Sequence, residues 1–254
     1  MDIFSWNVNG IRAVTKKGFF DWIEDEGPDI LTLQEIRIQE EQISNKLQNI
    51  DSYYSYFNYG KRKGYSGVAL YSKIEPNKVE NGLGIKRFDQ EGRVIKAFYD
   101  DFVLMGIYFP NGKRSNERLN YKLDFYDEVL KQAEDLKKEG HSIIISGDYN
   151  TAHKEIDLIN PEQNKNVSGF LPIERKWLDK LINHGYVDTF RHFNPKKEKY
   201  SWWSYRTRAR ERNAGWRIDY HFVSEDLLDN LKKAVIHEDV MGSDHCPISI
   251  TLDL

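Results

Sequence analysis

The stretch Ser146-Gly147-Asp148-Tyr149-Asn150-Thr151-Ala152-His153 follows the apolar run His141-Ser142-Ile143-Ile144-Ile145. A short continuous run of β-branched residues predicts a strand buried on both faces. We expect the chain to break at Gly147 and to place Asp148 and Asn150 just past the strand end, where ligands bind in open α/β sheets. A carboxylate and an amide there offer a base and a neutral hydrogen-bond donor to one reacting group. A plain turn is the alternative, because Asp, Gly and Asn are common turn residues.

The composition predicts one globular domain over residues 1–254. The chain is 39% apolar and 13% aromatic, which allows a sizeable core and argues against disorder. A net charge of -3 argues against the class of strongly basic proteins that wrap nucleic acid. Cys246 is the single cysteine, which excludes an intrachain disulfide and argues against a Cys-based zinc site. With no signal peptide or membrane-spanning run, we expect a cytoplasmic monomer, associated with the nucleoid in a prokaryote, that makes no membrane contact.

Strands and helices alternate along the chain, which predicts an α/β or α+β class. We expect a hairpin about Asp100-Asp101. We also expect a loop at 160–169, just before a helix at 172–183. The apolar pattern predicts strands at 3–8, 30–35, 53–59, 67–72, 93–99, 102–109, 141–145, 217–223 and 247–252, and helices at 18–26, 40–47, 116–139 and 172–183.

Oxygen and amide side chains recur just after these apolar runs, at Asn7, Glu35, Asp148 with Asn150, and Asp244. Each alone is compatible with ordinary surface polarity. Together, oxygen ligands without a Cys/His cluster suit a hard cation such as Mg²⁺ or Mn²⁺. The adjacent residues Asp244 and His245 suit two different roles: the carboxylate binds a metal ion, and the imidazole contacts the substrate.

Aromatic and basic residues interleave between Tyr200 and Arg212, in a segment that includes Trp202, Trp203 and Arg206. Arginines bind phosphates, and exposed aromatic faces stack on sugars or bases. Core tryptophans beside a solvated basic loop are the alternative interpretation of this segment.

These residues belong to a set of motifs that resembles the exonuclease III-like AP endonucleases of the endonuclease/exonuclease/phosphatase superfamily. The resemblance extends from Asp2 to the C-terminus, and its specificity lies in the order of the motifs. Eight motifs follow one another: Ser5-Trp6-Asn7-Val8-Asn9-Gly10-Ile11-Arg12-Ala13, Leu33-Gln34-Glu35, Gly64-Tyr65-Ser66-Gly67-Val68, Glu91-Gly92-Arg93-Val94, Tyr108-Phe109-Pro110-Asn111, Gly147-Asp148-Tyr149-Asn150-Thr151-Ala152-His153, Gly215-Trp216-Arg217-Ile218-Asp219-Tyr220 and Gly242-Ser243-Asp244-His245-Cys246-Pro247.

The resemblance implies a four-layered α/β sandwich of two packed mixed sheets flanked by helices. It implies Mg²⁺-dependent hydrolysis of the DNA phosphodiester 5′ to an abasic site, with 3′-5′ exonuclease and 3′-end-trimming activity; Mn²⁺ is expected to substitute. Double-stranded DNA with an abasic or damaged nucleotide is the implied partner. We further expect incision at some deaminated nucleotides, such as uridine, because Trp202 is a large ring and Lys122 faces the site.

The same resemblance implies a role for each candidate residue. Glu35, with Asn7 and Asp244, is the implied metal position, and a second position near Asp148, Asn150 and His245 stays open. Asp148 orients or deprotonates the attacking water, Asp219 holds His245, and Asn150, His245 and Tyr108 contact the phosphate. Trp202, Trp216 and Ile218 wall the sugar pocket, and Val167 replaces a family asparagine. The implied DNA contacts are Arg12, Tyr65, Arg93, Asn111, Arg114, Lys122, Asn164, Trp202, Arg206, Trp216 and Ile218.

Two other functions compete with this interpretation. One is a phosphoesterase of the same superfamily that acts on a non-DNA phosphate ester. The other is a DNA-binding module without catalysis. It is disfavoured because the chain has the full candidate set of Glu35, Asp148, Asn150, Asp219, Asp244 and His245.

Overall fold

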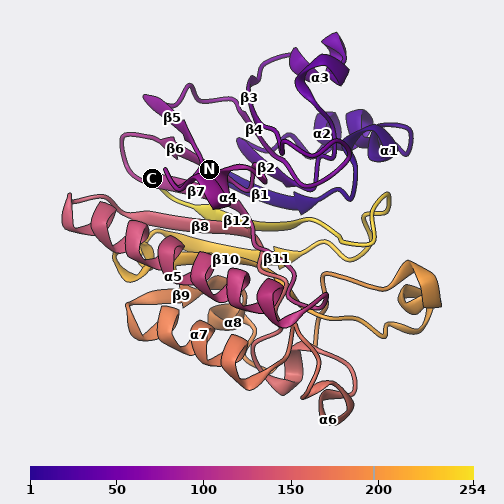
Figure 1. Cartoon of the computed structure of the whole chain (residues 1–254). Helices are drawn as coiled ribbons and strands as arrows, with labels where there is room; N and C mark the ends of the chain where they lie inside the picture. The colour runs from indigo at the N-terminus through magenta and orange to yellow at the C-terminus, as the bar shows by residue number, and fades with distance from the viewer. Residues whose placement is uncertain (197) are drawn as a thin grey trace.

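The computed structural model describes residues 1–196 and 198–254, which form two six-stranded sheets and the helices that cover them (Figure 1). The strands are β1 Asp2–Asn7, β2 Ile30–Gln34, β3 Tyr54–Asn58, β4 Val68–Ser72, β5 Lys78–Asn81, β6 Val94–Phe98, β7 Val103–Tyr108, β8 Ile143–Asp148, β9 Tyr186–Asp188, β10 Asp219–Ser224, β11 Leu231–Ile236 and β12 Ile248–Leu252. The α-helices are α1 Ile11–Thr15, α2 Phe19–Glu26, α3 Asn45–Gln48, α4 Lys86–Asp89, α5 Asn116–Lys138, α6 Pro161–Asn164, α7 Pro172–Asn183 and α8 Thr189–Phe193.

Each sheet is mixed, with one parallel pair near its centre. The first sheet has the strand order β11-β12-β1-β2-β4-β3, and its parallel pair is β1 with β2. The second has the order β5-β6-β7-β8-β10-β9, and its parallel pair is β7 with β8. The remaining neighbours are antiparallel.

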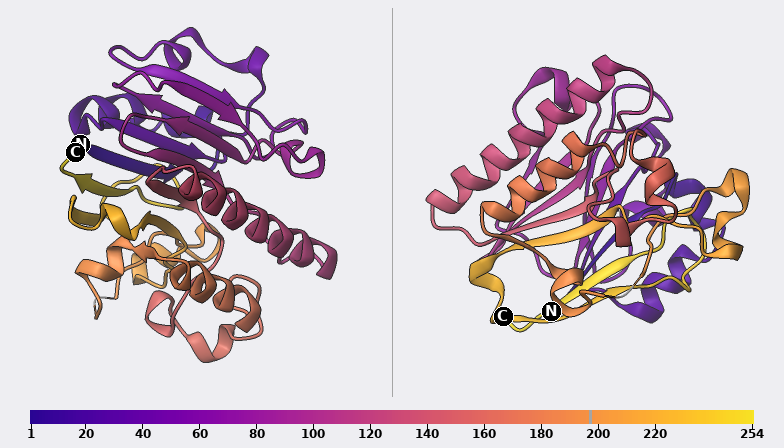
Figure 2. Two further views of the ribbon diagram at one scale, coloured as in Figure 1. Left: turned by 90° about the vertical axis from the view of Figure 1, so that its left-hand side faces the viewer. Right: turned by 90° about the horizontal axis from the view of Figure 1, so that it is seen from below.

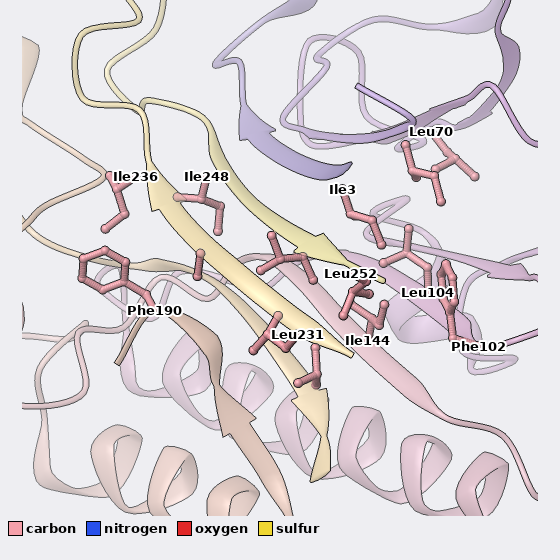
Figure 3. Close-up of a cluster of buried hydrophobic side chains, with 14 of the residues drawn as sticks. Ile3, Leu70, Phe102, Leu104, Ile144, Phe190, Leu231, Ile236, Ile248 and Leu252 are labelled. Carbon is pink, nitrogen blue, oxygen red and sulfur yellow. The ribbon is translucent and has the colours of Figure 1, made fainter. Parts of the chain in front are cut away.

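The two sheets pack face to face, and side chains alternate between their inner and outer faces. On β1, Ile3 belongs to the apolar layer between the sheets, whereas Phe4 and Trp6 pack outward with α1 and α2. On β8, Ile144 faces inward (Figure 3), whereas its neighbours Ile143 and Ile145 pack outward with α5 and α7. The order helix, sheet, sheet, helix confirms the predicted four-layered sandwich (Figure 2).

Most of the long predicted elements are confirmed, but the stretch at 146–153 differs from our prediction. The chain does not break at Gly147, because β8 runs on to Asp148. The predicted helix at 40–47 is instead a 3₁₀ turn, Glu40–Gln42, followed by the short α3. The predicted loop at 160–169 contains α6. No helix in the described part of the chain is long and apolar enough to cross a membrane.

Candidate active site

The site lies where the layer between the sheets changes from apolar to polar. On the second sheet, Tyr108, Asp148 and Asp219 occupy one row, since Asp148 pairs with Tyr108 on β7 and with Asp219 on β10. Asp148 is four residues beyond the inward-facing Ile144 and therefore also points between the sheets. Asn7 ends β1 with the same inward parity as Ile3. The register thus brings residues distant in sequence to one end of the sandwich.

Gly147 permits the close approach of β8 to β7 beside this row. It has a φ of 142°, and a Cβ at this position would lie 1.8 Å from the carbonyl oxygen of Ile107. Any side chain here would force the two strands apart. Asn9, Glu35 and Asn150 also have positive φ values, of 46°, 53° and 52°. Such conformations cost about 1–3 kcal/mol each in non-glycine residues and concentrate at functional sites.

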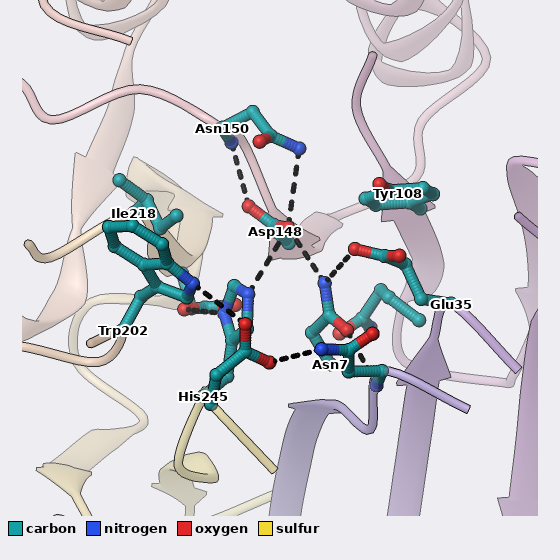
Figure 4. Close-up of polar contacts among 12 residues, drawn as sticks. Asn7, Glu35, Tyr108, Asp148, Asn150, Trp202, Ile218 and His245 are labelled. Atoms are coloured by element: carbon teal, nitrogen blue, oxygen red, sulfur yellow. Dashed lines mark hydrogen bonds and ion pairs between the residues drawn. The ribbon is translucent and has the colours of Figure 1, made fainter. Parts of the chain in front are cut away.

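Asp148 is the centre of the hydrogen-bond network (Figure 4). Its Oδ1 accepts from the backbone N–H of Asn150 at 2.7 Å, as in the turn that we considered as an alternative. Its Oδ2 accepts from Asn7 Nδ2 at 2.8 Å and from Asn150 Nδ2 at 3.3 Å. The Nε2 of His245 lies 3.9 Å from the same oxygen. The stretch is therefore both a turn and a site in which a fully buried carboxylate is held in a fixed orientation.

His245 is held from its other side by Asp219. The Nδ1 of His245 lies 2.9 Å from Asp219 Oδ2, and this oxygen also accepts from Ser201 Oγ at 2.6 Å. The Ser201 oxygen in turn accepts from the backbone N–H groups of Ile218 and Asp219. This chain fixes the imidazole with Nε2 directed at Asp148.

Burial and neighbouring charges shift the pKa of both groups upward. Burial, with the carboxylates of Asp219 and Glu35, raises the pKa of Asp148 to about 7, although His245 opposes the shift. Burial alone would lower the pKa of His245, but the hydrogen-bonded carboxylate of Asp219 outweighs it and raises the pKa to about 10. At neutral pH the imidazole therefore carries a proton, and a carboxylate with a pKa near 7 suits a general base.

Among the His, Cys, Asp and Glu side chains of residues 1–196 and 198–254, Glu35, Asp148 and His245 lie close enough to share a metal ion. Their ligand atoms lie within 4.8 Å of one another. Asn7 Nδ2 joins the two carboxylates by donating to Glu35 at 2.9 Å and to Asp148. Asp244 is outside this close group: its oxygens accept from Asn9 at 2.7 Å and from Trp202 Nε1 at 3.1 Å. The predicted metal set of Glu35, Asn7 and Asp244 is thus only partly brought together.

The residues fit a hard divalent cation. Carboxylate oxygens are the ligands that Mg²⁺ and Mn²⁺ prefer. Burial raises the pKa of Asp148, and repulsion from the carboxylates of Asp219 and Glu35 disfavours its ionised form further. A bound cation would relieve this repulsion and stabilise the ionised carboxylates.

A cavity of about 240 Å³ opens above these groups. Its floor includes Glu35, Asp148 and His245, and its walls include Trp202 and Trp216. The rings of the two tryptophans stand at 85° to each other, 6.4 Å apart between centroids. The remaining lining residues are Asn9, Arg37, Tyr108, Asn111, Lys113, Asn150, Gly169, Ile218 and Asp244. The volume is below the roughly 300–1,000 Å³ of sites for drug-sized ligands, which favours a small group.

The prediction that Lys122 contacts DNA is wrong, because its side chain is fully buried. Its Nζ donates to Glu174 Oε1 and Thr151 Oγ1, both at 2.7 Å, and to the backbone carbonyl of Asn150 at 2.8 Å. Burial lowers the pKa of Lys122, and Glu174 opposes that shift. The pair lies behind the site and fixes the backbone that follows Asp148.

Arg93 does not reach solvent either, so the predicted DNA contact is wrong. Only 1% of the residue is exposed. Its guanidinium lies 4.4 Å from the ring of Tyr108 and donates to the Tyr108 carbonyl at 2.9 Å and to Tyr65 Oη at 3.0 Å. Arg93 therefore supports Tyr108 from within the fold.

The other predicted DNA contacts have mixed surroundings. Arg12, Arg114 and Arg206 are exposed. Asn164 is half-buried, and its amide donates to the backbone carbonyls of Ile159 and Asn160. Contact between any of these residues and DNA stays a prediction.

Several site residues were missed by the sequence interpretation. Asn111 is not one of them, because it was a predicted DNA contact, and it donates to Asn150 Oδ1 at 2.9 Å. Arg37 forms a salt bridge with Glu35, and its position two residues after this carboxylate was the sign that the sequence offered. Ser201, which holds Asp219, carries no pattern that distinguishes it from other serines. Lys113 lines the cavity from the segment between β7 and α5.

This fold and this site define a class of protein in which two packed sheets present carboxylates, an amide and an imidazole to a small cavity. The model of the endonuclease/exonuclease/phosphatase family matches residues 4–245, and the chain belongs to that family. The resemblance inferred from the eight motifs is thereby confirmed.

Individual relatives agree over the full length of the chain. An exodeoxyribonuclease of Bacillus subtilis is 45% identical over 256 residues and is matched over 100% of both chains. A DNA-(apurinic or apyrimidinic site) endonuclease of Dictyostelium discoideum is 43% identical. The match covers 100% of this chain and 71% of that protein. The structure of a 3′-5′ exonuclease from Neisseria meningitidis superposes with a TM-score of 0.92 at 27% identity, over 100% of both chains.

Proposed function

We propose that the protein is a Mg²⁺-dependent DNA repair endonuclease that hydrolyses the phosphodiester 5′ to an abasic site in duplex DNA and leaves a 3′-hydroxyl. The observation that carries the proposal is the position of Asp148. This buried carboxylate is fixed by Asn7 and Asn150 and faces an imidazole, on the floor of a cavity with tryptophan walls. Relatives named for exodeoxyribonuclease and AP endonuclease activities support DNA as the substrate.

The site residues divide the work of phosphodiester hydrolysis. Asp148 orients the attacking water and accepts its proton. The imidazolium of His245 and the amide of Asn150 donate to the phosphate oxygens as negative charge develops. Glu35, assisted by Asn7, would hold the metal ion, with Asp148 in reach of the same position. The ion supplies Lewis-acid stabilisation of the phosphoryl oxygens when it is bound.

The cavity walls are proposed to select the abasic nucleotide. Trp216 and Ile218 pack with Phe170 and Leu158 in a small apolar cluster, and Trp202 packs against it. An abasic sugar enters such a pocket at low cost, because no base has to be unpaired or unstacked. Incision at uridine rests on Trp202 alone, since Lys122 is enclosed. Exonuclease and 3′-end-trimming activity and a cytoplasmic, nucleoid-associated location stay predictions.

The test uses a labelled duplex with one tetrahydrofuran analogue of the abasic site, incubated with Mg²⁺ or with EDTA. The analogue has no aldehyde and cannot undergo β-elimination, so only hydrolysis can nick it. We expect a Mg²⁺-dependent nick 5′ to the analogue that ends in a 3′-hydroxyl, and a much slower nick with Asp148→Asn. A folded protein that leaves this duplex intact but hydrolyses small phosphate esters would overturn the proposal in favour of the phosphoesterase alternative. A parallel duplex with uridine tests the wider pocket.

A further inference from the structure

Lys113 is a site residue that the proposed hydrolysis does not use. It lies in the segment between β7 and α5, where its backbone N–H donates to Asn111 Oδ1 at 2.9 Å. Its Nζ lies 5.6 Å from the ring of Trp202 and 5.3 Å from that of Trp216, the two walls of the cavity. Among the described residues that line this cavity, Lys113 is the one lysine.

The amine of Lys113 differs from that of the other lysine near the site. Lys122 is enclosed and donates three hydrogen bonds. Lys113 remains open to solvent, and no hydrogen-bond acceptor or carboxylate within residues 1–196 and 198–254 pairs with its Nζ. An amine in a cavity lining that has no hydrogen-bonding or carboxylate partner is available to a ligand.

The surroundings also favour the neutral, nucleophilic form of this amine. Partial burial among neighbouring protein atoms lowers the pKa of Lys113, although the carboxylates of Glu174 and Asp148 oppose the shift. Lysines in partly desolvated pockets are the ones that form Schiff bases with carbonyl substrates. An abasic deoxyribose in its open-chain form carries such a carbonyl, the aldehyde at C1′.

We propose that Lys113 forms a Schiff base with the C1′ aldehyde of the abasic sugar, which gives the protein a second, metal-independent lyase activity. The inference rests on the proposed function for the identity of the sugar in the pocket. Nζ attacks C1′, a C–N bond forms, and water leaves as the imine is made. The protonated imine acidifies C2′, whose proton passes to solvent. The C3′–O3′ bond then breaks, the 3′-phosphate departs with the electron pair, and hydrolysis of the imine restores the lysine.

This reaction cuts the opposite side of the abasic site from the proposed hydrolysis. Elimination leaves an unsaturated aldehyde on the 3′ end and a 5′-phosphate on the other fragment, whereas hydrolysis leaves a 3′-hydroxyl. The two activities also differ in metal dependence, because imine formation needs no cation. They are therefore separable in one set of reactions.

The test is borohydride trapping in EDTA on two matched duplexes, one with a natural abasic site and one with the tetrahydrofuran analogue. We expect a covalent protein–DNA adduct with the abasic duplex and none with the analogue, and we expect mass spectrometry to map it to Lys113. Lys113→Arg keeps the positive charge and loses the adduct. Lys17→Arg is the matched control, since Lys17 also lies 5.6 Å from an aromatic ring, that of Tyr205, and does not line the cavity.

Each outcome separates this inference from the proposed function. A Mg²⁺-dependent nick at the analogue without a trapped adduct overturns the lyase activity and leaves the hydrolysis standing. An adduct mapped to Lys113 without that nick supports the lyase activity and overturns the proposed hydrolysis. An adduct that maps to other lysines, or that persists in Lys113→Arg, also overturns the inference. Mapping on the unmodified protein makes the result independent of the folding of any variant.

Discussion

Two clusters of buried charge are built on neighbouring segments of the chain and have different designs. In the first, Arg217 donates to Asp157 at 2.8 Å and to both oxygens of Asp188, and Arg191 also pairs with Asp157. In the second, the active site, Asp148 and Asp219 flank His245. Arg217 and Asp219 are two residues apart in the sequence and belong to one cluster each.

The difference lies in charge balance and closure. The first cluster has two carboxylates and two guanidiniums. In the second, the carboxylates of Glu35, Asp148 and Asp219 meet one imidazole and one guanidinium, and among described residues Asp219 Oδ1 has no partner. The first cluster is closed, whereas the second forms the floor of a cavity. A balanced network is costly to break by removal of one partner, and an unbalanced one favours binding of a cation and of a reacting group.

The strongest test of this comparison is the substitution Asp148→Asn. Loss of the general base is expected to lower the rate of nicking at the tetrahydrofuran analogue by about 10²–10⁴-fold. Stability is expected to be unchanged or increased, because the substitution removes a buried charge that lies near Glu35 and Asp219. Single-turnover nicking and urea denaturation check the two parts. A variant that is less stable and equally active would break the comparison.

The matching substitution in the closed cluster is Asp157→Asn. It leaves Arg217 and Arg191 without one of their carboxylates, and the expected loss is about 3–5 kcal/mol in the free energy of unfolding. Nicking by the folded variant at low temperature is expected to stay near that of the unmodified protein. The exposed pair of Lys138 with Asp135 is the control, since Lys138→Gln is expected to leave the free energy of unfolding almost unchanged.

Metal binding is expected to affect the two clusters differently. At ten times its dissociation constant, Mg²⁺ adds about 1.4 kcal/mol to the stability of a protein that binds it only when folded. For a chain of this size the melting temperature rises by about 3–6 °C. Glu35→Gln should remove most of this increase, and Asp157→Asn should keep it. Differential scanning calorimetry with Mg²⁺ and with EDTA decides; an equal increase in the Glu35 variant would place the ion elsewhere.

The pH dependence of stability is expected to have opposite signs in the two clusters. The pKa of Asp148 is raised from 3.8 to about 7. Its contribution to stability is therefore lost as the pH rises through that window. Arg217 and Arg191 outweigh burial and lower the pKa of Asp157, so its contribution is present above pH ~4 and lost as the pH falls.

Urea titrations in EDTA from pH 4 to pH 8 measure this contrast. Relative to the unmodified protein, Asp148→Asn is expected to be more stabilising at pH 8 than at pH 4. Asp157→Asn is expected to be most destabilising in the neutral range. Parallel pH profiles for the unmodified protein and for both variants would contradict the assignment.

The central strands could be predicted from the sequence, because a buried strand is a visible apolar run. Ile143 to Ile145 is such a run, and β8 forms there. The strands that were missed, β5, β9 and β11, include both edge strands of the second sheet and one of the first. Edge strands are half-exposed, so their polar and charged residues hide the pattern, as Lys232 and Lys233 do in β11.

The candidate site was predictable where side-chain chemistry and strand ends coincide. Asp148, Asn150 and Asp219 follow or begin apolar strands, and the register brings them together. Charged residues that pair internally were not predictable, because sequence gives no sign of a partner far along the chain. Lys122 is the clearest case: Glu174, which neutralises it, lies 52 residues away.

That contrast yields the smallest predicted effect, on the salt dependence of DNA binding. Each phosphate contact contributes about 0.9 to the slope of log affinity against log salt concentration. Arg206 is exposed, so Arg206→Ala is expected to reduce the slope by about 0.9 if this side chain meets a phosphate. Lys122 is enclosed, so Lys122→Met should leave the slope unchanged. The substitution is still expected to destabilise the fold, because the buried carboxylate of Glu174 loses its cation. Fluorescence anisotropy with an abasic duplex in EDTA, below the melting temperature of each variant, measures both slopes. A reduced slope for Lys122→Met would mean that this buried lysine reaches the DNA after all, whereas an unchanged slope for Arg206→Ala would remove that arginine from the phosphate-binding surface.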